Sequence, residues 1–288
     1  MKNKKINILL TGSGAPGTRG TVYSLREIKY INKIIGVDIV RNYSSISLVD
    51  KFYKIPKPSS DLYAKKILYV CNKNNISLIL PQTTNETSFF TKYKKFFEKC
   101  NIKVLVSNLR SFNIANDKYL TNKLFKSIGF SVPKTYEITK KTEIIKYLEI
   151  LNFPKNKVVI KARNLFGKRG FLILDNGKFS IKDFLNNKVV DNIINYETFK
   201  STFPDTFPSM MIMEFLPGKE YSVDMFIGKK ISISIPRIRS KIRSGISYST
   251  KIDQNKNIIN QSLKFAERIK YKGILGLKFK ENINKNPM

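Results

Sequence analysis

The sequence predicts an α/β protein with more than one compact unit, and three observations support this. Over residues 1 to 110, short apolar segments typical of strands alternate with segments whose apolar residues recur at helical spacing. This alternation favours a parallel sheet covered by helices. Later in the chain, residues 210–224 contain an apolar segment that ends in a carboxylate, a Pro-Gly turn and an alternating strand. At 288 residues the chain can bury roughly 75% of its unfolded surface, which is enough for two or three units.

The elements of the first part follow from this alternation. We expect strands at residues 6–10, 33–39, 77–83 and 103–108. We expect helices at residues 22–30, 61–71 and 89–99. The first apolar segment is too short for the core of a signal peptide, so it is interpreted as a strand.

A glycine-rich loop follows the first strand. Gly12, Gly14 and Gly17 have the spacing G-x-G-x-x-G, and Asp38 follows about 20 residues later. In the dinucleotide fingerprint, a helix N-terminus binds the pyrophosphate and the acid binds a ribose. An NAD(P)-binding oxidoreductase that uses the loop from Gly12 to Gly17 is therefore one hypothesis. A glycine turn without a cofactor is the favoured interpretation, because the fingerprint alone is weak and Pro16 lies inside the loop.

The second part begins with a helix from Asp117 to Ile128, whose first carboxylate suits the helix dipole. Further helices are expected at 142–151 and 260–269. Strands are expected at residues 135–139, 157–162, 171–174, 210–213, 220–224, 229–243 and 273–282. Residues 210–224, taken alone, also fit a simple β-hairpin with a charged rim.

Basic residues and glycines lie close together between residues 157 and 170. Lys161 belongs to a strand, and the loop after it contains Gly167, Lys168, Arg169 and Gly170. Glycine lets the backbone close over phosphates, and the charged side chains can bind them. A basic hairpin exposed to solvent is the alternative.

Two arginines of the later basic strand are candidate catalytic residues. The planar guanidinium groups of Arg237 and Arg243 suit carboxylates and acyl phosphates, so we expect them near an acceptor substrate or a γ-phosphate. A solvated basic strand edge is the alternative in so lysine-rich a chain.

Four motifs occur in an order that resembles the ATP-grasp superfamily. They are Asp117-Lys118, VVIKA with Lys161, GKRG, and MEFLPGKEYSVD. The resemblance extends from the first strand to the last residue, and it is closest to the branch of the carbamoyl phosphate synthetase large chain and related carboxylate–amine ligases. It implies an N-terminal, Rossmann-like parallel-sheet domain followed by an ATP-grasp fold with a small α+β lid and a large core. The implied parts are residues 1–111, a connecting helix at 112–135, the lid at 136–213 and the large subdomain at 214–288.

The resemblance also implies roles in binding ATP. The phosphates would be held by Lys118, Lys161, Gly167, Lys168, Arg169 and Gly170. Glu214 would accept from the adenine amino group, and the Leu216 backbone, beside Phe215, would meet the ring edge. Glu220 would bind the ribose hydroxyls, because a carboxylate is an acceptor only.

The implied reaction is ATP-dependent formation of a C–N bond. A carboxylate attacks the γ-phosphorus to give an acyl phosphate, and an amine then displaces phosphate, so the partners are ATP, a small carboxylate and an amine. Mg²⁺ would bridge the β- and γ-phosphates. Lys278 stands where a metal-facing Gln or acid is expected, and the second metal-binding strand would start where the sequence ends. We therefore expect either an incomplete core, with its metal ligands beyond residue 288, or a degenerate member of the superfamily. In either case this chain could be inactive. A non-catalytic nucleotide-binding relative is a further hypothesis.

Composition narrows the remaining classes. The chain has no His, which excludes Ser-His and Cys-His nucleophile pairs and histidine metal sites. Cys71 and Cys100 offer no disulfide framework, which favours a reducing cytoplasm. No apolar run approaches the roughly 20 residues of a membrane helix. The net charge of +32 comes from lysines spread along the chain, which favours a compositional bias over nucleic-acid or membrane binding. We expect neither a nucleic-acid partner nor a membrane partner. A homodimer is a possible assembly.

Overall fold

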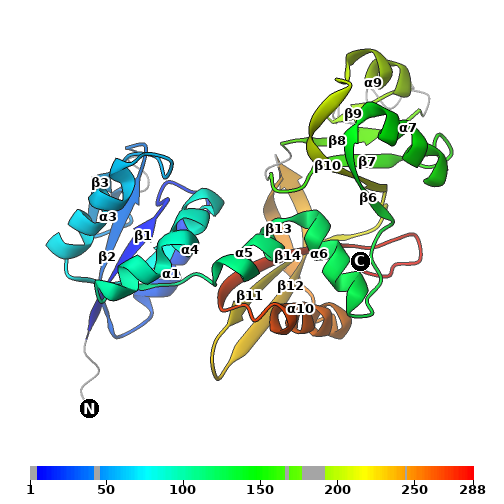
Figure 1. Ribbon diagram of the computed structural model, residues 1–288. Helices are drawn as coiled ribbons and strands as arrows, with labels where there is room; N and C mark the ends of the chain where they lie inside the picture. The colour runs from blue at the N-terminus through cyan, green and yellow to red at the C-terminus, as the bar shows by residue number, and fades with distance from the viewer. Residues whose placement is uncertain (1–4, 42–45, 166–168, 177–191, 244) are drawn as a thin grey trace. The chain divides into compact units, whose positions relative to one another are not determined.

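The computed structural model describes residues 5–41, 46–165, 169–176, 192–243 and 245–288 (Figure 1). The chain forms two compact units. The first contains Met1–Phe112 with Tyr271–Ile274, and the second contains Asn113–Lys270 with Leu275–Met288. Both units combine helices with sheets, as the sequence predicts. The finer boundaries predicted within the second unit stay predictions.

The first unit is built on a five-stranded parallel sheet with the strand order β3-β2-β1-β4-β5. Its strands are β1 Ile6–Thr11, β2 Ile31–Asp38, β3 Lys51–Lys54, β4 Ile76–Pro81 and β5 Lys103–Val104. Its helices are α1 Thr18–Arg26, α3 Leu62–Lys73 and α4 Thr84–Lys99, and α5 Leu109–Asn116 follows the last strand. The N-terminal parallel-sheet domain is confirmed.

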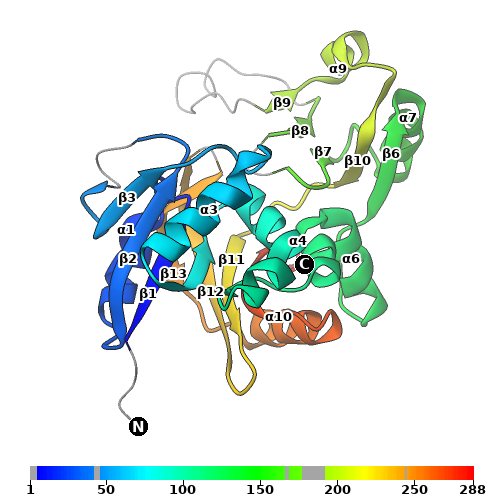
Figure 2. The same ribbon diagram turned by 60° about the vertical axis from the view of Figure 1, so that its left-hand side comes forward.

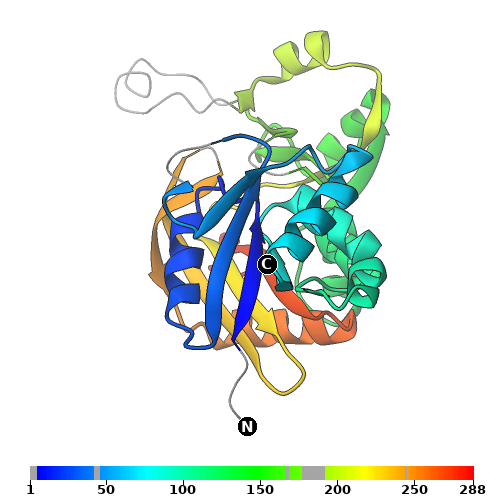
Figure 3. The ribbon, with the colours of Figure 1, turned by 90° about the vertical axis from the view of Figure 1, so that its left-hand side faces the viewer.

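Helices cover both faces of this sheet (Figure 3). Ile8 and Leu10 of β1 pack with Val22 of α1, whereas Leu9 packs on the other face with Tyr63 of α3. Strands that are buried on both faces form continuous apolar runs. For this reason the central strands could be recognised in the sequence.

The sequence did not predict β3 and α5, and it misplaced several ends. The edge strand β3 has the sequence KFYK, in which lysines flank only two apolar residues. The strand expected at 103–108 pairs with β4 only through Lys103 and Val104. Helix α4 begins at Thr84, five residues before the expected start, because the Thr83 hydroxyl caps it by accepting a backbone N–H of the first turn.

The second unit contains two sheets. The lid sheet has the order β6-β10-β7-β8-β9, and the core sheet has the order β13-β12-β11-β14. The lid strands are β6 Thr135–Lys140, β7 Val158–Ala162, β8 Phe171–Leu174, β9 Ile193–Ile194 and β10 Thr206–Glu214. The core strands are β11 Glu220–Ile227, β12 Ser232–Arg243, β13 Ile246–Ile252 and β14 Gly273–Lys280. The helices are α6 Lys118–Ser127, α7 Lys141–Ile150, α9 Tyr196–Thr202 and α10 Lys256–Arg268.

Helices α7 and α9 pack against one face of the lid sheet (Figure 2). Ile160 of β7 and Ile212 of β10 belong to the cluster on this face, together with Ile144 of α7 and Phe199 of α9. Because side chains alternate along a strand, Lys161 of β7 projects from the opposite face. The lid sheet thus presents a second face, without these helices, to the rest of its unit.

The core sheet is also covered on one face. Phe279 of β14 contacts Phe125 of α6, and Phe125 stacks on Phe265 of α10 with ring centroids 4.7 Å apart. Leu275 and Leu277 of β14 are buried in phase with Phe279. The even-numbered residues of β14 therefore project from the other face.

Residues 210–224 do not form a hairpin, so that alternative was wrong. β10 pairs with β6 and β7 in the lid sheet, whereas β11 belongs to the core sheet. The turn between them pairs with the end of β14: Gly218 N donates to Glu281 O at 3.0 Å, and Glu281 N donates to Lys219 O at 2.9 Å. A Cβ at Gly218 would lie 2.5 Å from Glu281 Cβ, so only glycine fits this close approach. The Pro-Gly turn carries the chain from one sheet to the other.

Candidate functional site

The start of α6 and the end of β7 are joined by an ion pair. The Asp117 carboxylate caps α6 by accepting the N–H groups of Tyr119 at 2.9 Å and Leu120 at 3.1 Å. The same carboxylate accepts from Arg163 Nε at 3.0 Å and Nη2 at 2.6 Å. Arg163 also pairs with Glu137 and lies over the Tyr119 ring. The negative charge of Asp117 is therefore compensated within the protein.

Lys118 points along the end of β7. Its ammonium donates to the carbonyl oxygens of Arg163 at 3.1 Å and Leu165 at 2.6 Å, and Ala162 O lies 3.4 Å away. Burial and the charge of Lys278 lower the pKa of Lys118 to about 8, while Asp117 opposes the shift. Among the described residues, no carboxylate forms an ion pair with this ammonium.

Lys161 lies in β7, opposite Met211 of β10 in the sheet register. Burial, followed by the positive charges of Lys118 and Lys278, lowers the pKa of Lys161 to about 8. Glu220 acts in the opposite direction, and Lys280 adds to the lowering. Within the described part of the chain, no hydrogen bond or ion pair of the Lys161 ammonium is found. A cation that is buried beside other cations without a partner favours a negatively charged ligand.

The core sheet supplies two further lysines. Lys278 and Lys280 of β14 both have lowered pKa values, in each case chiefly because the surrounding protein removes part of the water around the ammonium group. Lys278 Nζ lies 3.8 Å from Glu220 Oε1, and Lys280 lies over the Phe215 ring, 4.9 Å from its centroid. We call Lys118, Lys161, Lys278 and Lys280 the lysine cluster.

Arg239 of β12, like Lys280, belongs to this site although the sequence analysis did not name it. It is only 8% exposed, and its guanidinium pairs with Glu220 and donates to Ser247 Oγ and Gly245 O, both at 2.6 Å. The period of two along β12 puts Arg239 in phase with Arg237, so strand alternation was the signal that could have indicated it. With Arg239, the lysine cluster forms a group of five cations, and the Glu220 carboxylate acts on four of them: Arg239, Lys278, Lys161 and Lys280.

An apolar wall adjoins Lys161 on the same face of the lid sheet. Buried Val159, Ile173, Met211 and Met213 form it, with half-buried rings of Tyr119, Phe171 and Phe215 packed against them. Leu216 is buried at the start of the turn to the core sheet. An apolar wall beside a group of cations can take a flat aromatic ring that carries phosphates.

Glu214 has a structural partner. Its Oε1 accepts from Lys134 N at 2.8 Å, and its own N–H donates to Lys134 O at 3.1 Å. These bonds tie the end of β10 to the entry of β6. The predicted contact with an adenine amino group stays a prediction.

The glycine loop after β7 is only partly described. Gly167 and Lys168 lie outside the described residues. Arg169 and Gly170 form a turn that leads into β8, where Gly170 has φ +59° and a Cβ on it would lie 2.8 Å from Ala162 Cβ. The Gly170 carbonyl accepts from Ala162 N at 2.6 Å, which closes the loop at its base. Glycine is required there, but phosphate binding by this loop stays a prediction.

Of the two candidate catalytic arginines, the structure describes the side chain of Arg237 alone. Arg237 forms an ion pair with Asp224 at 2.6 Å and donates to Thr250 Oγ1 at 3.2 Å, so a carboxylate already compensates its charge. Arg243 ends β12, and its side chain lies outside what the structure describes. Their predicted role toward an acceptor substrate stays a prediction.

The glycine loop of the first unit is closed by the protein's own carboxylates. Asp38 Oδ2 accepts from Gly14 N at 2.8 Å, and Oδ1 accepts from Val40 N at 3.1 Å. Gly12 has φ +61°, and a Cβ on it would lie 2.6 Å from the Glu86 carboxylate. In a dinucleotide site the acid would have to reach a ribose. Here Asp38 holds the loop instead.

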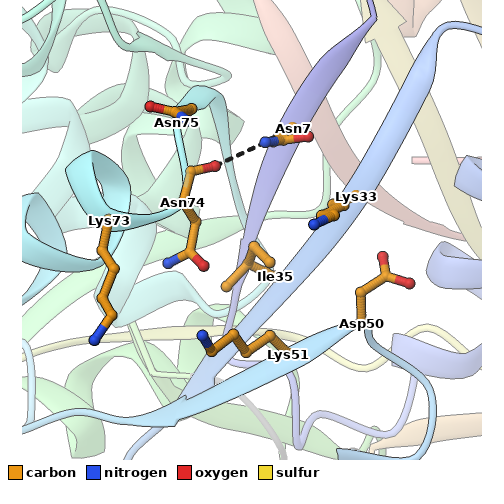
Figure 4. A pocket seen from close by; sticks show the side chains of 8 residues that line it. All are labelled: Asn7, Lys33, Ile35, Asp50, Lys51, Lys73, Asn74 and Asn75. Carbon is orange, nitrogen blue, oxygen red and sulfur yellow. Dashed lines mark hydrogen bonds between the residues drawn. The ribbon is translucent and has the colours of Figure 1, made fainter.

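A pocket of about 310 Å³ lies elsewhere in the first unit (Figure 4). It is lined by Asn7, Lys33, Ile35, Asp50, Lys51, Lys73, Asn74 and Asn75. Asn7 donates to Asn74 O at 2.7 Å within the pocket, and Asp50 pairs with Arg26 outside it. The pocket lies at the amino ends of the parallel strands, whereas ligands of open α/β sheets bind at the carboxyl ends. We assign it no role.

Two searches of the described residues were negative. No described helix has the length and apolar character needed to cross a membrane. In the same residues, no three Asp, Glu, Cys or His side chains come together as a potential metal site.

The fold agrees with the predicted resemblance to ATP-grasp proteins, and comparisons with known proteins support the ATP-grasp fold. Residues 206–288 match the family model described as "ATP-grasp in the biosynthetic pathway with Ter operon". Residues 8–105 match the model described as "PylC-like, N-terminal domain". A search of curated proteins found no match to the sequence.

The solved structures that resemble the chain cover almost all of it. N5-carboxyaminoimidazole synthetase from Staphylococcus aureus, complexed with ADP, has a TM-score of 0.70 and 18% identity over 99% of this chain and 69% of its own. The biotin carboxylase domain of 2-oxoglutarate carboxylase from Hydrogenobacter thermophilus, a dimer with MgADP, ADP and bicarbonate, has a TM-score of 0.66 and 15% identity over 99% and 63%. Biotin carboxylase from Campylobacter jejuni, complexed with β,γ-ATP, has a TM-score of 0.65 and 18% identity over 99% and 64%.

These comparisons decide between some of the hypotheses. They support the ATP-grasp architecture and give no support to an oxidoreductase that uses the loop from Gly12 to Gly17. The particular resemblance to the carbamoyl phosphate synthetase branch stays a prediction.

Proposed function

We propose that the chain binds ATP at the lysine cluster and belongs to an ATP-dependent carboxylate–amine ligase that acts through an acyl phosphate. The observation that carries this proposal is the group of five cations beside Glu220, in which the half-buried Lys161 has no ion-pair partner among the described residues. Nucleotide polyphosphates supply the negative charge that this arrangement lacks. The N5-carboxyaminoimidazole synthetase and biotin carboxylase structures named above contain ADP or an ATP analogue, which supports the same ligand class.

In this proposal each part of the nucleotide has its own surface. The phosphates bind to Lys118 and Lys161, and residues 167–170 are proposed to bind them as well, with Gly167 and Lys168 outside the described residues. The base lies against the apolar wall at Phe215 and Leu216. The ion pairs of Glu220 use its Oε1, so Oε2 can accept from a ribose hydroxyl. Glu214 remains near the base through its position at the end of β10.

The proposed reaction has two steps: ATP activates a substrate carboxylate as an acyl phosphate, and an amine then reacts with the acyl phosphate. A substrate carboxylate oxygen attacks the γ-phosphorus, the bond to the β-phosphate oxygen breaks, and ADP leaves. The nitrogen of an amine then attacks the acyl carbon, phosphate leaves, and a base accepts the proton of the amine. Lysine side chains around the phosphates would stabilise the charge that develops on their oxygens. Arg237 and Arg243 are proposed to orient the acceptor carboxylate.

The divalent cation used by the fold family is a separate question. One similar structure contains MgADP. In the described residues of this chain, the carboxylates that act on these cations are Glu220, which already pairs with Arg239, and Asp117, which already pairs with Arg163. This donor set does not fit Mg²⁺, which prefers several oxygen ligands in octahedral geometry. We route no step of the reaction through a metal.

A hydroxylamine trap tests the ligase proposal. The chain is incubated with ATP, a panel of small carboxylates and hydroxylamine, which captures an acyl phosphate as a hydroxamate. The proposal predicts one carboxylate that gives hydroxamate and ADP in equal amounts. ATP binding without hydroxamate for any carboxylate would favour the non-catalytic relative, and absence of ATP binding would contradict the proposal as a whole.

The proposal also covers location and assembly. Cys71 and Cys100 are both free thiols, which suits the reducing cytoplasm. A homodimer is proposed because the similar biotin carboxylase domain is described as a dimer. Sedimentation of the purified chain at several concentrations tests the dimer, and a single species of monomer mass at all of them would contradict it.

A further inference from the structure

We propose that Lys278 and Lys280 take the place of a divalent cation, so that this chain binds nucleotide phosphates without a metal ion. The inference rests on the proposed nucleotide site and goes beyond it, because it concerns what neutralises the phosphates. It is based on the side chains that project from the face of the core sheet opposite to helices α6 and α10.

The first observation is the position of the two lysines. Along β14 the odd-numbered residues are buried against the helices, whereas Lys278 and Lys280 project from the other face. That is the face on which Glu220 and Arg239 pair. Lys278 Nζ lies 3.8 Å from Glu220 Oε1, so its ammonium occupies the space beside the carboxylate.

The second observation is that three described carboxylates of this unit already pair with arginines. Arg239 pairs with Glu220, Arg237 with Asp224, and Arg163 with Asp117. The buried Glu281, directly after β14, accepts from Tyr221 Oη at 2.7 Å and from Lys219 N at 3.2 Å. A magnesium ion would have to compete for these oxygens. It would also have to lose water, which it releases reluctantly.

The third observation is the repulsion that the cations exert on one another. Lys278 and Lys280 both contribute to the lowered pKa of Lys161, and Lys278 contributes to that of Lys118. A divalent cation placed among them would meet the same repulsion, whereas a phosphate would relieve it. An ammonium binds phosphate as a point charge and needs no octahedral geometry. The lysines can therefore do electrostatically what the metal does in relatives that hold MgADP.

Calorimetric titration of the full chain with ATP tests this inference, once in EDTA and once in excess MgCl2. Wild type is expected to bind ATP in EDTA at least as tightly as in MgCl2, because free ATP carries more negative charge. Lys278→Glu places a second carboxylate beside Glu220. This variant is expected to bind ATP about 30-fold more weakly than wild type in EDTA. Its affinity is expected to rise about tenfold when EDTA is replaced by MgCl2.

Two further variants keep the test sharp. Lys229→Glu makes the same charge change in the exposed turn between β11 and β12, and it is expected to alter affinity less than about twofold in either condition. Lys278→Gln removes the charge without adding a carboxylate, and it is expected to weaken binding about tenfold in EDTA with no recovery in MgCl2. Because the Lys278 side chain is 61% exposed, both changes at this position should leave the fold intact.

The outcomes separate this inference from the proposed function. Wild-type binding that requires Mg²⁺ would overturn the inference and leave the nucleotide site standing. Equal effects of Lys278→Glu and Lys229→Glu would also overturn it. Absence of binding in both conditions would contradict the proposed function, and the inference with it.

Discussion

The glycine loop of the first unit and the lysine cluster of the second unit both look like phosphate sites in the sequence, but the structure treats them differently. In the glycine loop the available N–H groups and carboxylates bind each other: Asp38 holds Gly14 and Val40, and Glu86 lies under Gly12. In the lysine cluster, by contrast, Lys161 has no ion-pair partner among the described residues, and Lys278 shares Glu220 with Arg239. A motif marks a ligand site when its charge is left uncompensated by the protein.

The largest expected effect is on the free energy of unfolding, and it comes from the Asp117 carboxylate of the second unit. Asp117→Ala removes the cap of α6 and the partner of Arg163, so the free energy of unfolding should fall by about 3 kcal/mol. Asp38→Ala removes only two N–H acceptors in the glycine loop, and it should cost about 1 kcal/mol. Urea denaturation of both variants measures the difference. An equal loss of unfolding free energy in the two variants would contradict this expected difference between Asp117 and Asp38.

The next effect concerns binding. Lys161→Ala should weaken ATP binding about 10- to 100-fold, because one charge-assisted bond to phosphate is worth about 1.5 to 3 kcal/mol. Lys229→Ala, in an exposed turn of the same unit, is the matched control and should leave affinity unchanged. Equal effects at the two lysines, measured by calorimetry, would mean that general positive charge rather than the lysine cluster attracts the nucleotide.

A substitution in the glycine loop should affect the fold and not binding. Gly12 has φ +61°, and a Cβ would meet Glu86 Oε2 and Thr83 Cγ2 at 2.6 Å. Gly12→Ala should therefore lower the free energy of unfolding of the first unit by about 2 kcal/mol. The affinity for ATP should stay the same. A loss of ATP affinity in a variant that remains folded would place the glycine loop at the nucleotide site.

The smallest effect is the dependence of binding on pH. The pKa values of Lys118 and Lys161 are lowered to about 8 by burial and by neighbouring lysines, against the opposing charges of Asp117 and Glu220. Bound phosphate favours the charged lysines, so ATP binding should take up protons, and affinity should fall about tenfold between pH 7 and pH 9. Lys278 and Lys280, whose pKa values are also lowered, act in the same direction.

The unliganded protein should show the opposite trend in stability. Above pH 8 the folded lysines lose protons that the unfolded chain keeps up to about pH 10.4, so this contribution makes stability rise with pH through that window. Calorimetry in buffers with different ionisation enthalpies measures the protons taken up on binding. Release of protons at pH 8.5, or none, would contradict the lowered pKa values.

Local patterns in the sequence predicted much of the fold. Asp117 as a helix start, the strand with Lys161 and the alternating strand with Lys278 all lie where the residues indicated. These features depend on a few neighbouring residues, and such patterns are visible without tertiary contacts. The edge strand β3 has too few apolar residues to show the same signal.

Long-range pairing could not be predicted from the sequence. The assignment of β10 and β11 to different sheets depends on Met211 pairing with Lys161 and Glu137, which are distant in sequence. The pairing of Glu220 with Arg239 joins residues 19 positions apart, and without it Arg239 looks like any other basic residue of the strand. Only the fold reveals that Arg239 is buried beside the lysines, whereas the role predicted for Arg237 stays a prediction.

Thermal unfolding of the full chain with ATP, ADP or NAD tests the central claim most directly. If the lysine cluster is a nucleotide site, ATP at 100 times its dissociation constant should stabilise the chain by about 2.7 kcal/mol, and ADP should give a smaller shift at equal concentration. NAD should have no effect, because Asp38 holds the glycine loop closed. The ATP shift should be lost in Lys161→Ala. Stabilisation by NAD without stabilisation by ATP or ADP would contradict the account.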